Sequence, residues 1–370
     1  MKILTNLLLS LLALSMFVPL TATRVMAQDA SQSAVAASQD DNTLILHTMQ
    51  RDSPRPRRFT VEEIEAAGTG LPSWNGSFTH SGTTYKFVMV GTDPSKGSIN
   101  TVVPVYLIPI KLTFQDTGTV FDASAPMIGL TQSAAQAVQA SIIFQDTTYK
   151  AGTVTVGNTQ YIDAFQRANF WSSVGTTSPN YHVILGQPTV LPVQALKVPK
   201  ASGQTIPGPV AGTKRGILAQ GFVDTNITAA MFKKFPQITP GAFTIFLVYN
   251  VFPGGNYGFH DVFGSSPLTG KTYTVTSYLE PYKQLIDADI STLAHEVGEW
   301  MDDPYVNNNT PCGTLLEVGD PLNTAIFSVK LGGMTWHPQD LAMLGYFSFN
   351  GTQSVNHWLT FRNTIKKSCG

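Results

Sequence analysis

The sequence contains little charge. Asp, Glu, Lys and Arg make up 13% of its 370 residues, roughly half the share of an ordinary soluble domain, and the formal net charge is −1. This composition argues against a highly charged helical bundle or coiled coil. Because no basic excess is present to neutralise phosphates, it also disfavours nucleic-acid binding. With 43% hydrophobic residues, 31 glycines and 23 prolines, the chain is expected to form a turn-rich globular fold that contains β-sheet.

Long apolar runs are also scarce. The run from Leu7 to Leu20 follows Lys2 and precedes Val25-Met26-Ala27, whose small residues suit a cleavage site. This pattern is typical of a signal peptide over residues 1–27, and an N-terminal membrane anchor is the alternative. No later stretch approaches the roughly 18 apolar residues of a membrane-spanning helix. We therefore expect a secreted or periplasmic protein with no stable membrane insertion after signal cleavage.

The chain has two cysteines, Cys312 and Cys369. So distant a pair is a poor zinc site by itself. In an exported protein the pair predicts one structural disulfide, and two free thiols are the alternative.

Motifs for several common chemistries are missing. The sequence has no Walker A loop, no Gly-x-Gly-x-x-Gly between a strand and a helix, and no Gly-x-Ser-x-Gly elbow. Nucleotide-dependent and serine-hydrolase functions are disfavoured accordingly.

The chain beyond the signal peptide divides into a leader and one domain. Residues 28–70 are rich in Ala, Ser, Gln and Asp and contain a Pro-Arg run, which predicts a flexible leader or pro-segment with a short helix at 61–67. From residue 71 onward we expect a single α+β domain. Its β-rich N-terminal half would pack on a C-terminal half that carries a functional helix, with the site region at about 255–345.

Local patterns predict the elements of this domain. Residues 242–252 are almost continuously apolar, which predicts a central, buried strand. Pro104 and Pro109 favour an edge strand or a bulge for residues 101–110. The other expected strands are 85–90, 181–185, 189–198, 217–223 and 271–279, and the other expected helices are 132–144 and 159–173.

A helix with readable ends is expected just before Pro304, which forbids its continuation. Asp287 or Asp289 can cap its first amides. At 100° per residue, its apolar positions fall within one arc. They are Ile290, Leu293, Val297, Trp300 and Met301.

On the opposite arc, His295 and Glu299 lie one turn apart. Two ligands at this spacing can bind one divalent ion, and Glu296 beside them can hold the metal-bound water as general base. The usual signature is His-Glu-x-x-His, from which this sequence departs at Glu299. The alternative interpretation is a polar helix face exposed to solvent.

Acidic residues cluster here in a chain otherwise poor in charge. Residues 295–303 contain four carboxylates and one His, a self-repelling group without a cation. Glu317 and Asp320 follow shortly downstream. Together these features favour a metal site.

The run His295-Glu-Val-Gly-Glu299-Trp-Met-Asp-Asp-Pro304 and the later Glu317-Val-Gly-Asp320 resemble a family pattern. They are similar to the His-Glu-x-x-Glu and Glu-Ile-Gly-Asp segments of the EXORDIUM, or phosphate-induced, extracellular proteins, and to related secreted microbial proteins. The resemblance covers about residues 255–345. It implies a zincin-like metal site with His295, Glu299 and Glu317 as ligands, although the EXORDIUM group is best known as wall-associated and growth-related. The strand expected at 271–279 fits this arrangement, in which a substrate backbone pairs with a sheet edge above the helix.

Further residues are candidates for supporting roles. Asp320 is expected to orient a ligand, and Asp320 or His337 would replace Glu317 if that side chain faces away. His260 and His337 lie in segments similar to others of the same group, Gly258-Phe259-His260 and Trp336-His337-Pro338-Gln339-Asp340. They are candidates for stabilising an oxyanion or holding a substrate group, and packed core histidines are the alternative.

Zn²⁺ is the expected ion, and oxygen-rich ligation makes Mn²⁺ or Ca²⁺ credible competitors. We therefore expect a secreted metal-dependent hydrolase of the zincin-type metallopeptidase class. The alternative is a non-catalytic extracellular or cell-wall-associated protein with a structural metal site. Its partner would be a peptide or cell-wall polymer, not a nucleic acid.

Overall fold

The computed structural model describes residues 59–175, 177–280, 288–312, 315–350 and 360–362. The predicted signal peptide and Asp287 lie outside these ranges. Contacts divide the chain into Met1–Ala37 and Ser38–Gly370, and all described residues belong to the second unit. Cys312 is disulfide-bonded, and Cys369, its expected partner, lies outside the described residues.

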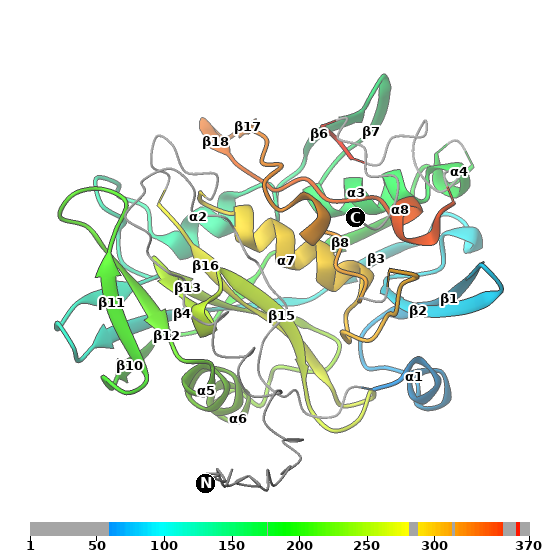
Figure 1. The fold of residues 1–370 in the computed structure, drawn as a ribbon. Coiled ribbons are helices and arrows are strands. Elements are labelled where there is room, and N and C mark those ends of the chain that lie inside the picture. The colour runs from blue at the N-terminus through cyan, green and yellow to red at the C-terminus, as the bar shows by residue number, and fades with distance from the viewer. Residues whose placement is uncertain (1–58, 176, 281–287, 313–314, 351–359, 363–370) are drawn as a thin grey trace, which may run out of the picture. The chain divides into compact units, whose positions relative to one another are not determined.

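A mixed sheet of seven strands organises the described residues (Figure 1). Its main order is β10-β4-β13-β16-β15, with β5 and β9 also paired to β4. Neighbours from β10 to β16 run parallel, whereas β15 is antiparallel to β16 at one edge. The strands are β4 (Val105–Phe114), β5 (Val120–Asp122), β9 (Thr189–Val190), β10 (Gln194–Val198), β13 (Phe243–Tyr249), β15 (Gly258–Phe263) and β16 (Lys271–Tyr278).

The sheet is buried on both faces, as β13 shows most clearly. All seven of its residues are buried, and it pairs with β4 on one side and β16 on the other. Phe243 and Ile245 belong to one hydrophobic core, whereas Phe246 and Val248 belong to another. This alternation follows from the two-residue period of a strand. The prediction of a central, buried strand at 242–252 is confirmed, although β14 (Val251–Phe252) continues it in another sheet.

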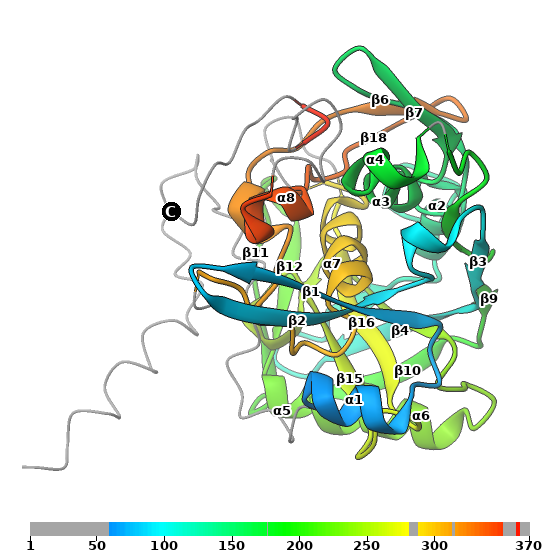
Figure 2. The same ribbon diagram turned by 90° about the vertical axis from the view of Figure 1, so that its right-hand side faces the viewer.

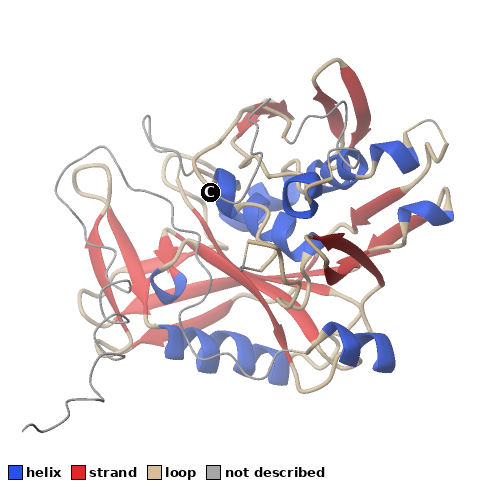
Figure 3. Ribbon diagram, turned by 45° about the vertical axis from the view of Figure 1, so that its right-hand side comes forward, coloured by secondary structure: helices blue, strands red, loops and turns tan. Residues whose placement is uncertain are grey.

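Helices cover both faces of this sheet (Figures 1 and 3). On one face lie α3 (Tyr161–Asn169) and α7 (Ser291–Asp302), and their apolar residues join the first core. On the other face lies a continuous helical stretch whose residues join the second core. It consists of α5 (Gln220–Phe222), the π-helix η2 (Val223–Ala229) and α6 (Ala230–Lys234).

Smaller elements surround this centre. The hairpin β1–β2 and the helix α1 lie on one side of α7 (Figure 2). The two-stranded pairs are β1 (Ser73–His80) with β2 (Thr83–Val90), β3 (Asn100–Val103) with β8 (His182–Leu185), β6 (Thr147–Ala151) with β7 (Val154–Thr159), and β17 (Val329–Leu331) with β18 (Met334–Trp336). A three-stranded sheet joins β11 (Gly203–Pro207), β12 (Lys214–Leu218) and β14. The other helices are α1 (Val61–Ala67), η1 (Pro94–Lys96), α2 (Ala134–Ala140), α4 (Trp171–Val174), η3 (Pro253–Gly255), η4 (Asp320–Leu322) and α8 (Leu344–Ser348).

The structure is 36% strand and 24% helix, a mixed composition consistent with the expected α+β class. The main sheet nevertheless takes strands from both halves of the chain, so the halves do not form separate layers. Most neighbouring strands of this sheet are parallel, and a parallel pair needs a long crossover connection. Strands that are far apart in the sequence therefore become neighbours in the sheet. Within the described residues, no helix is long and apolar enough to cross a bilayer.

The short helix expected at 61–67 is present as α1, within the stretch assigned to a leader. Thr60 and Glu63 form a capping box at its start. Phe59, Val61 and Ile64 are buried, so this end of the predicted leader packs on the fold.

Pro109 corrects the expectation of an edge strand or bulge at 101–110. Pro104 separates β3 from β4, but Pro109 lies inside β4, which is an interior strand. On one side β4 pairs with β9 at Tyr106 and Leu107, and with β10 from Ile110 onward. Pro109 falls between these pairings, where a missing N–H removes no ladder bond on that side.

Two other segments differ from their predictions. The strand expected at 217–223 ends at Leu218, and the chain turns into α5. Leu218, Phe222 and Val223 all belong to the second core. An apolar run this short does not show whether the segment is a strand or a helix. The helix expected at 159–173 breaks at Phe170, whose φ of −109° and ψ of 25° are not helical.

Candidate metal centre

The helix α7 ends where the sequence predicts, with Asp303 and Pro304 directly after Asp302. Its start differs from the prediction. Ile290 is the N-cap residue and no side chain caps the helix, so Asp289 is not the cap. The backbone of Asp289 has a φ of 47°, and the Asp289 carboxylate accepts hydrogen bonds from the Ile290 and His337 N–H groups instead.

This helix is buried on all sides. The expected apolar arc is confirmed, because each of its five residues is at most 1% exposed. However, His295 is 0%, Glu296 2% and Glu299 3% exposed, so the alternative of a solvated polar face is wrong. Buried charges need compensating partners, because desolvation costs several kcal/mol for each ion.

Three parts of the chain bring ionisable side chains together here. Besides the helix residues, β15 contributes His260, and the segment after residue 315 contributes Glu317 and Asp320. His295 Nε2 lies 3.0 Å from Glu299 Oε1 and 3.7 Å from Asp320 Oδ1. Glu317 hydrogen-bonds the Glu299 carboxyl group. The Asp320 side chain is 40% exposed, which makes it the solvent-facing member.

The cluster contains two groups of potential metal ligands that share one residue. His295, Glu296 and Glu299 form the first group, and His260, Glu299 and Glu317 form the second. Within each group the ligand atoms lie within 4.8 Å of one another. The structure therefore brings all four residues predicted to bind or orient a metal into one cluster with Glu296 and His260. The expected ligand set does not form one group, because Glu317 groups with His260 rather than with His295, and Asp320 belongs to neither group.

Gln339, which sequence reasoning did not single out, fixes the orientation of His295. Its Nε2 donates to the Gly319 carbonyl oxygen at 2.7 Å, so its Oε1 is the atom 2.7 Å from His295 Nδ1. An amide oxygen can only accept, which places a proton on Nδ1. In the neutral ring, Nε2 then presents its lone pair to Glu299 and Asp320. A metal-binding imidazole is typically held in this way. Gln339 lies in the Trp336–Asp340 segment, in which the sequence analysis chose His337 as the candidate site residue.

Gly319 shows why the downstream motif contains glycine. Its N–H donates to Glu299 Oε1 at 3.3 Å. A Cβ atom at this position would lie 2.3 Å from His295 Nδ1 and 2.6 Å from its Cε1. The backbone of this segment therefore packs directly on the imidazole ring, and a side chain would displace the ring or the segment.

His337 is not brought into the cluster. Its Nδ1 lies 2.7 Å from Asp289 Oδ2, and the ring is 32% exposed. This hydrogen bond raises the pKa of His337. It belongs to neither ligand group, and its predicted role at the oxyanion stays a prediction.

Burial dominates the electrostatics of the helix carboxylates. It raises the pKa of Glu296 to about 7, although the contacts with His260 and the charge of His295 offset part of the effect. Burial also raises the pKa of Glu299 well above its usual value, and the charges of Glu317 and Asp320 raise it further. Without a cation the protein thus favours protons on these groups.

The donor set fits a divalent ion. Two ligands that each lie about 2.1 Å from one ion are about 3.0–3.4 Å apart, close to the 3.0 Å between His295 Nε2 and Glu299 Oε1. The ring tautomer set by Gln339 also presents the correct atom. Imidazole with several carboxylates suits Zn²⁺ or Mn²⁺, and carboxylates alone would suit Ca²⁺ better.

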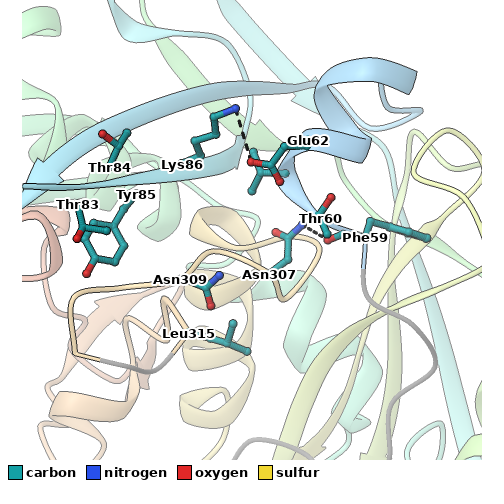
Figure 4. Close-up of a pocket in the computed structure, with 11 residues that line it drawn as sticks. Phe59, Thr60, Glu62, Thr83, Thr84, Tyr85, Lys86, Asn307, Asn309 and Leu315 are labelled. Carbon is teal, nitrogen blue, oxygen red and sulfur yellow. Dashed lines mark hydrogen bonds and ion pairs between the residues drawn. The ribbon is translucent and has the colours of Figure 1, made fainter.

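A separate pocket lies between α1, β2 and the segment after α7 (Figure 4). Thr60, Tyr85, Asn307, Asn309 and Leu315 are among its lining residues. Lys86 at its rim is paired with Glu65 at 2.8 Å and with Glu62 at 3.6 Å. None of the residues in the two ligand groups lines this pocket, so it is distinct from the candidate metal centre.

Comparison of the chain with protein-family models, with curated proteins and with solved structures gave no match. The functional argument therefore depends on the geometry of the site.

Proposed function

We propose that this chain is an exported, metal-dependent hydrolase of the zincin type that cleaves peptide bonds. The observation that carries the proposal is a buried cluster with two groups of potential ligands, His295 with Glu296 and Glu299, and His260 with Glu299 and Glu317. The orientation of His295 by Gln339 supports it.

When bound, a divalent ion would lower the pKa of a water molecule and polarise the substrate carbonyl group. Glu296 would then act as general base and take the proton as the water oxygen attacks the carbonyl carbon. The same carboxyl group would return this proton to the amide nitrogen as the carbon–nitrogen bond breaks. Gln339 and Gly319 would hold the imidazole and the Glu299 carboxylate in place during these steps.

The sheet edge beside the helix differs from the expected geometry for an extended substrate. The strand directly before α7, β16, is interior, and the edge strand beside the helix is the antiparallel β15. The contact between Gly258 and Glu296 shows how close the two elements are, since a Cβ on Gly258 would lie 3.1 Å from Glu296 Oε1. The residues of β15 before Phe263 are buried, so the expected pairing of a substrate backbone with this edge stays a prediction.

The decisive experiment is the substitution Glu296→Gln, assayed against peptide libraries with and without a chelator. Peptide cleavage should be abolished, while bound metal and melting temperature stay nearly unchanged, because the amide retains the shape of the side chain. Glu65→Gln, which alters an exposed partner of Lys86, is the matched control and should cleave normally. If Glu296→Gln cleaves every substrate of the wild type at an equal rate, Glu296 is not the general base.

One observation favours a second candidate function, a non-catalytic extracellular protein whose metal stabilises the fold. His295, Glu296 and Glu299 are at most 3% exposed, which suits a structural ion as well as a catalytic one. Under this alternative, removal of the metal lowers the melting temperature and no peptide in the library is cleaved.

A further inference from the structure

His260 repeats the bonding pattern of His295 from a different element. Its Nε2 lies 3.2 Å from the backbone carbonyl oxygen of Asp303. A carbonyl oxygen can only accept, so Nε2 carries a proton and donates it. In the neutral ring, Nδ1 then presents its lone pair to Glu296 Oε2 at 3.5 Å and to Glu299 Oε2 at 3.7 Å.

Both contacts are long for an ion pair between His260 and a carboxylate. A protonated Nδ1 that donated to a carboxylate would lie about 2.7–2.9 Å from the oxygen. Both observed distances exceed this range and approach the spacing of about 3.0–3.4 Å between two ligands of one ion. The ring is only 3% exposed, so solvent does not satisfy it in place of a partner.

Glu299 faces both histidines with different oxygen atoms. Its Oε1 lies 3.0 Å from His295 Nε2, and its Oε2 lies 3.7 Å from His260 Nδ1. Glu317 joins His260 and Glu299 in the second ligand group. A carboxylate that offers one oxygen to each of two donor groups has the form of a bridging ligand.

We infer that the centre binds two divalent ions, with a second ion at His260, Glu299 and Glu317 and the Glu299 carboxylate as the bridge between them. This inference builds on the metal in the proposed function and adds a site to it. In the proposed peptide cleavage, a second ion would add to the polarisation of the substrate carbonyl group and to the lowering of the pKa of the attacking water.

The test uses the full chain, stripped with a chelator, saturated with Mn²⁺ and desalted. Elemental analysis should find two Mn²⁺ per chain, and the electron paramagnetic resonance spectrum should be that of an exchange-coupled pair. One Mn²⁺ per chain, no binding, or two uncoupled ions would each overturn the inference.

Variants assign the sites. His260→Gln should bind a single Mn²⁺ with the spectrum of an isolated ion, whereas the matched control His182→Gln should keep the coupled pair, because His182 pairs with Asp163 elsewhere. If His260→Gln fails to fold, as judged by circular dichroism, Glu317→Gln tests the same site. A variant at either position that keeps the coupled pair would contradict the ligand assignment.

The outcomes also separate this inference from the proposed function. A coupled pair in a protein that cleaves no peptide would preserve the second site and remove the hydrolase. Peptide cleavage by a protein that binds one ion per chain would support the hydrolase and remove the second metal site.

Discussion

The substitution Gly319→Ala tests whether the Glu-Val-Gly-Asp segment packs on the imidazole of His295. The new Cβ would lie 2.3 Å from Nδ1 and 2.6 Å from Cε1, whereas carbon atoms in contact are about 3.5–4.0 Å apart. The ring or the segment must therefore move by about 1 Å. The ring is fully buried and hydrogen-bonded to Gln339, so neither can move freely.

Overpacking of this kind costs about 1–3 kcal/mol. For a chain of this size the cost corresponds to a fall in melting temperature of about 1–4 °C. Displacement of the ring also disturbs Nε2 and the Gln339 contact, so the affinity for Zn²⁺ should fall by about 10–100-fold.

Calorimetry with chelator gives the first quantity, and a chelator-competition titration with Zn²⁺ gives the second. Gly221→Ala is the matched control, because a Cβ there meets nothing within 4 Å, so the variant should keep the Zn²⁺ affinity and should not lower the melting temperature. If Gly319→Ala behaves like Gly221→Ala in both measurements, the segment does not pack on the imidazole as described.

Three further predictions concern other contacts. Burial raises the pKa of Asp302 to about 7 from 3.8, so its ionised form disfavours the folded state. The stability of Asp302→Asn relative to the wild type should thus grow from about pH 4 to pH 7, to at most about 4 kcal/mol, and a gap in urea unfolding that is equal at pH 4 and pH 8 would contradict this. Gln339→Leu should weaken Zn²⁺ binding by about 10–100-fold in the same competition titration, and unchanged affinity would show that Gln339 does not orient His295. Thr60→Ala should lower the free energy of unfolding by about 1 kcal/mol through loss of the capping box, whereas Thr60→Ser should retain it, and equal stability of the two variants would exclude the cap.

Local sequence was sufficient for features that depend on neighbours along the chain. The spacing of His295 and Glu299 placed both side chains together, since residues four apart share a helix face. Pro304 fixed the end of α7, and the apolar run at 242–252 identified the buried strand β13. The capping box of α1 is likewise a local signal.

Other features could not be read from such patterns. The carboxylates around His295 looked equally like a solvated helix face, and only the packing of the main sheet and the segments after residue 315 showed that the helix is buried. Asp289 has the residue type of a helix cap, but its partner is His337, which the fold brings from far along the chain.

Helical periodicity is enough to predict that one turn of helix offers an imidazole and a carboxylate, because residues four apart lie on the same face. The position of His260 beside them and the tautomer that Gln339 sets for His295 depend on how the chain folds. His260 arrives on an antiparallel edge strand, and Gln339 is 44 residues beyond His295. Contacts of that length depend on strand order and chain crossovers, which no local periodicity encodes.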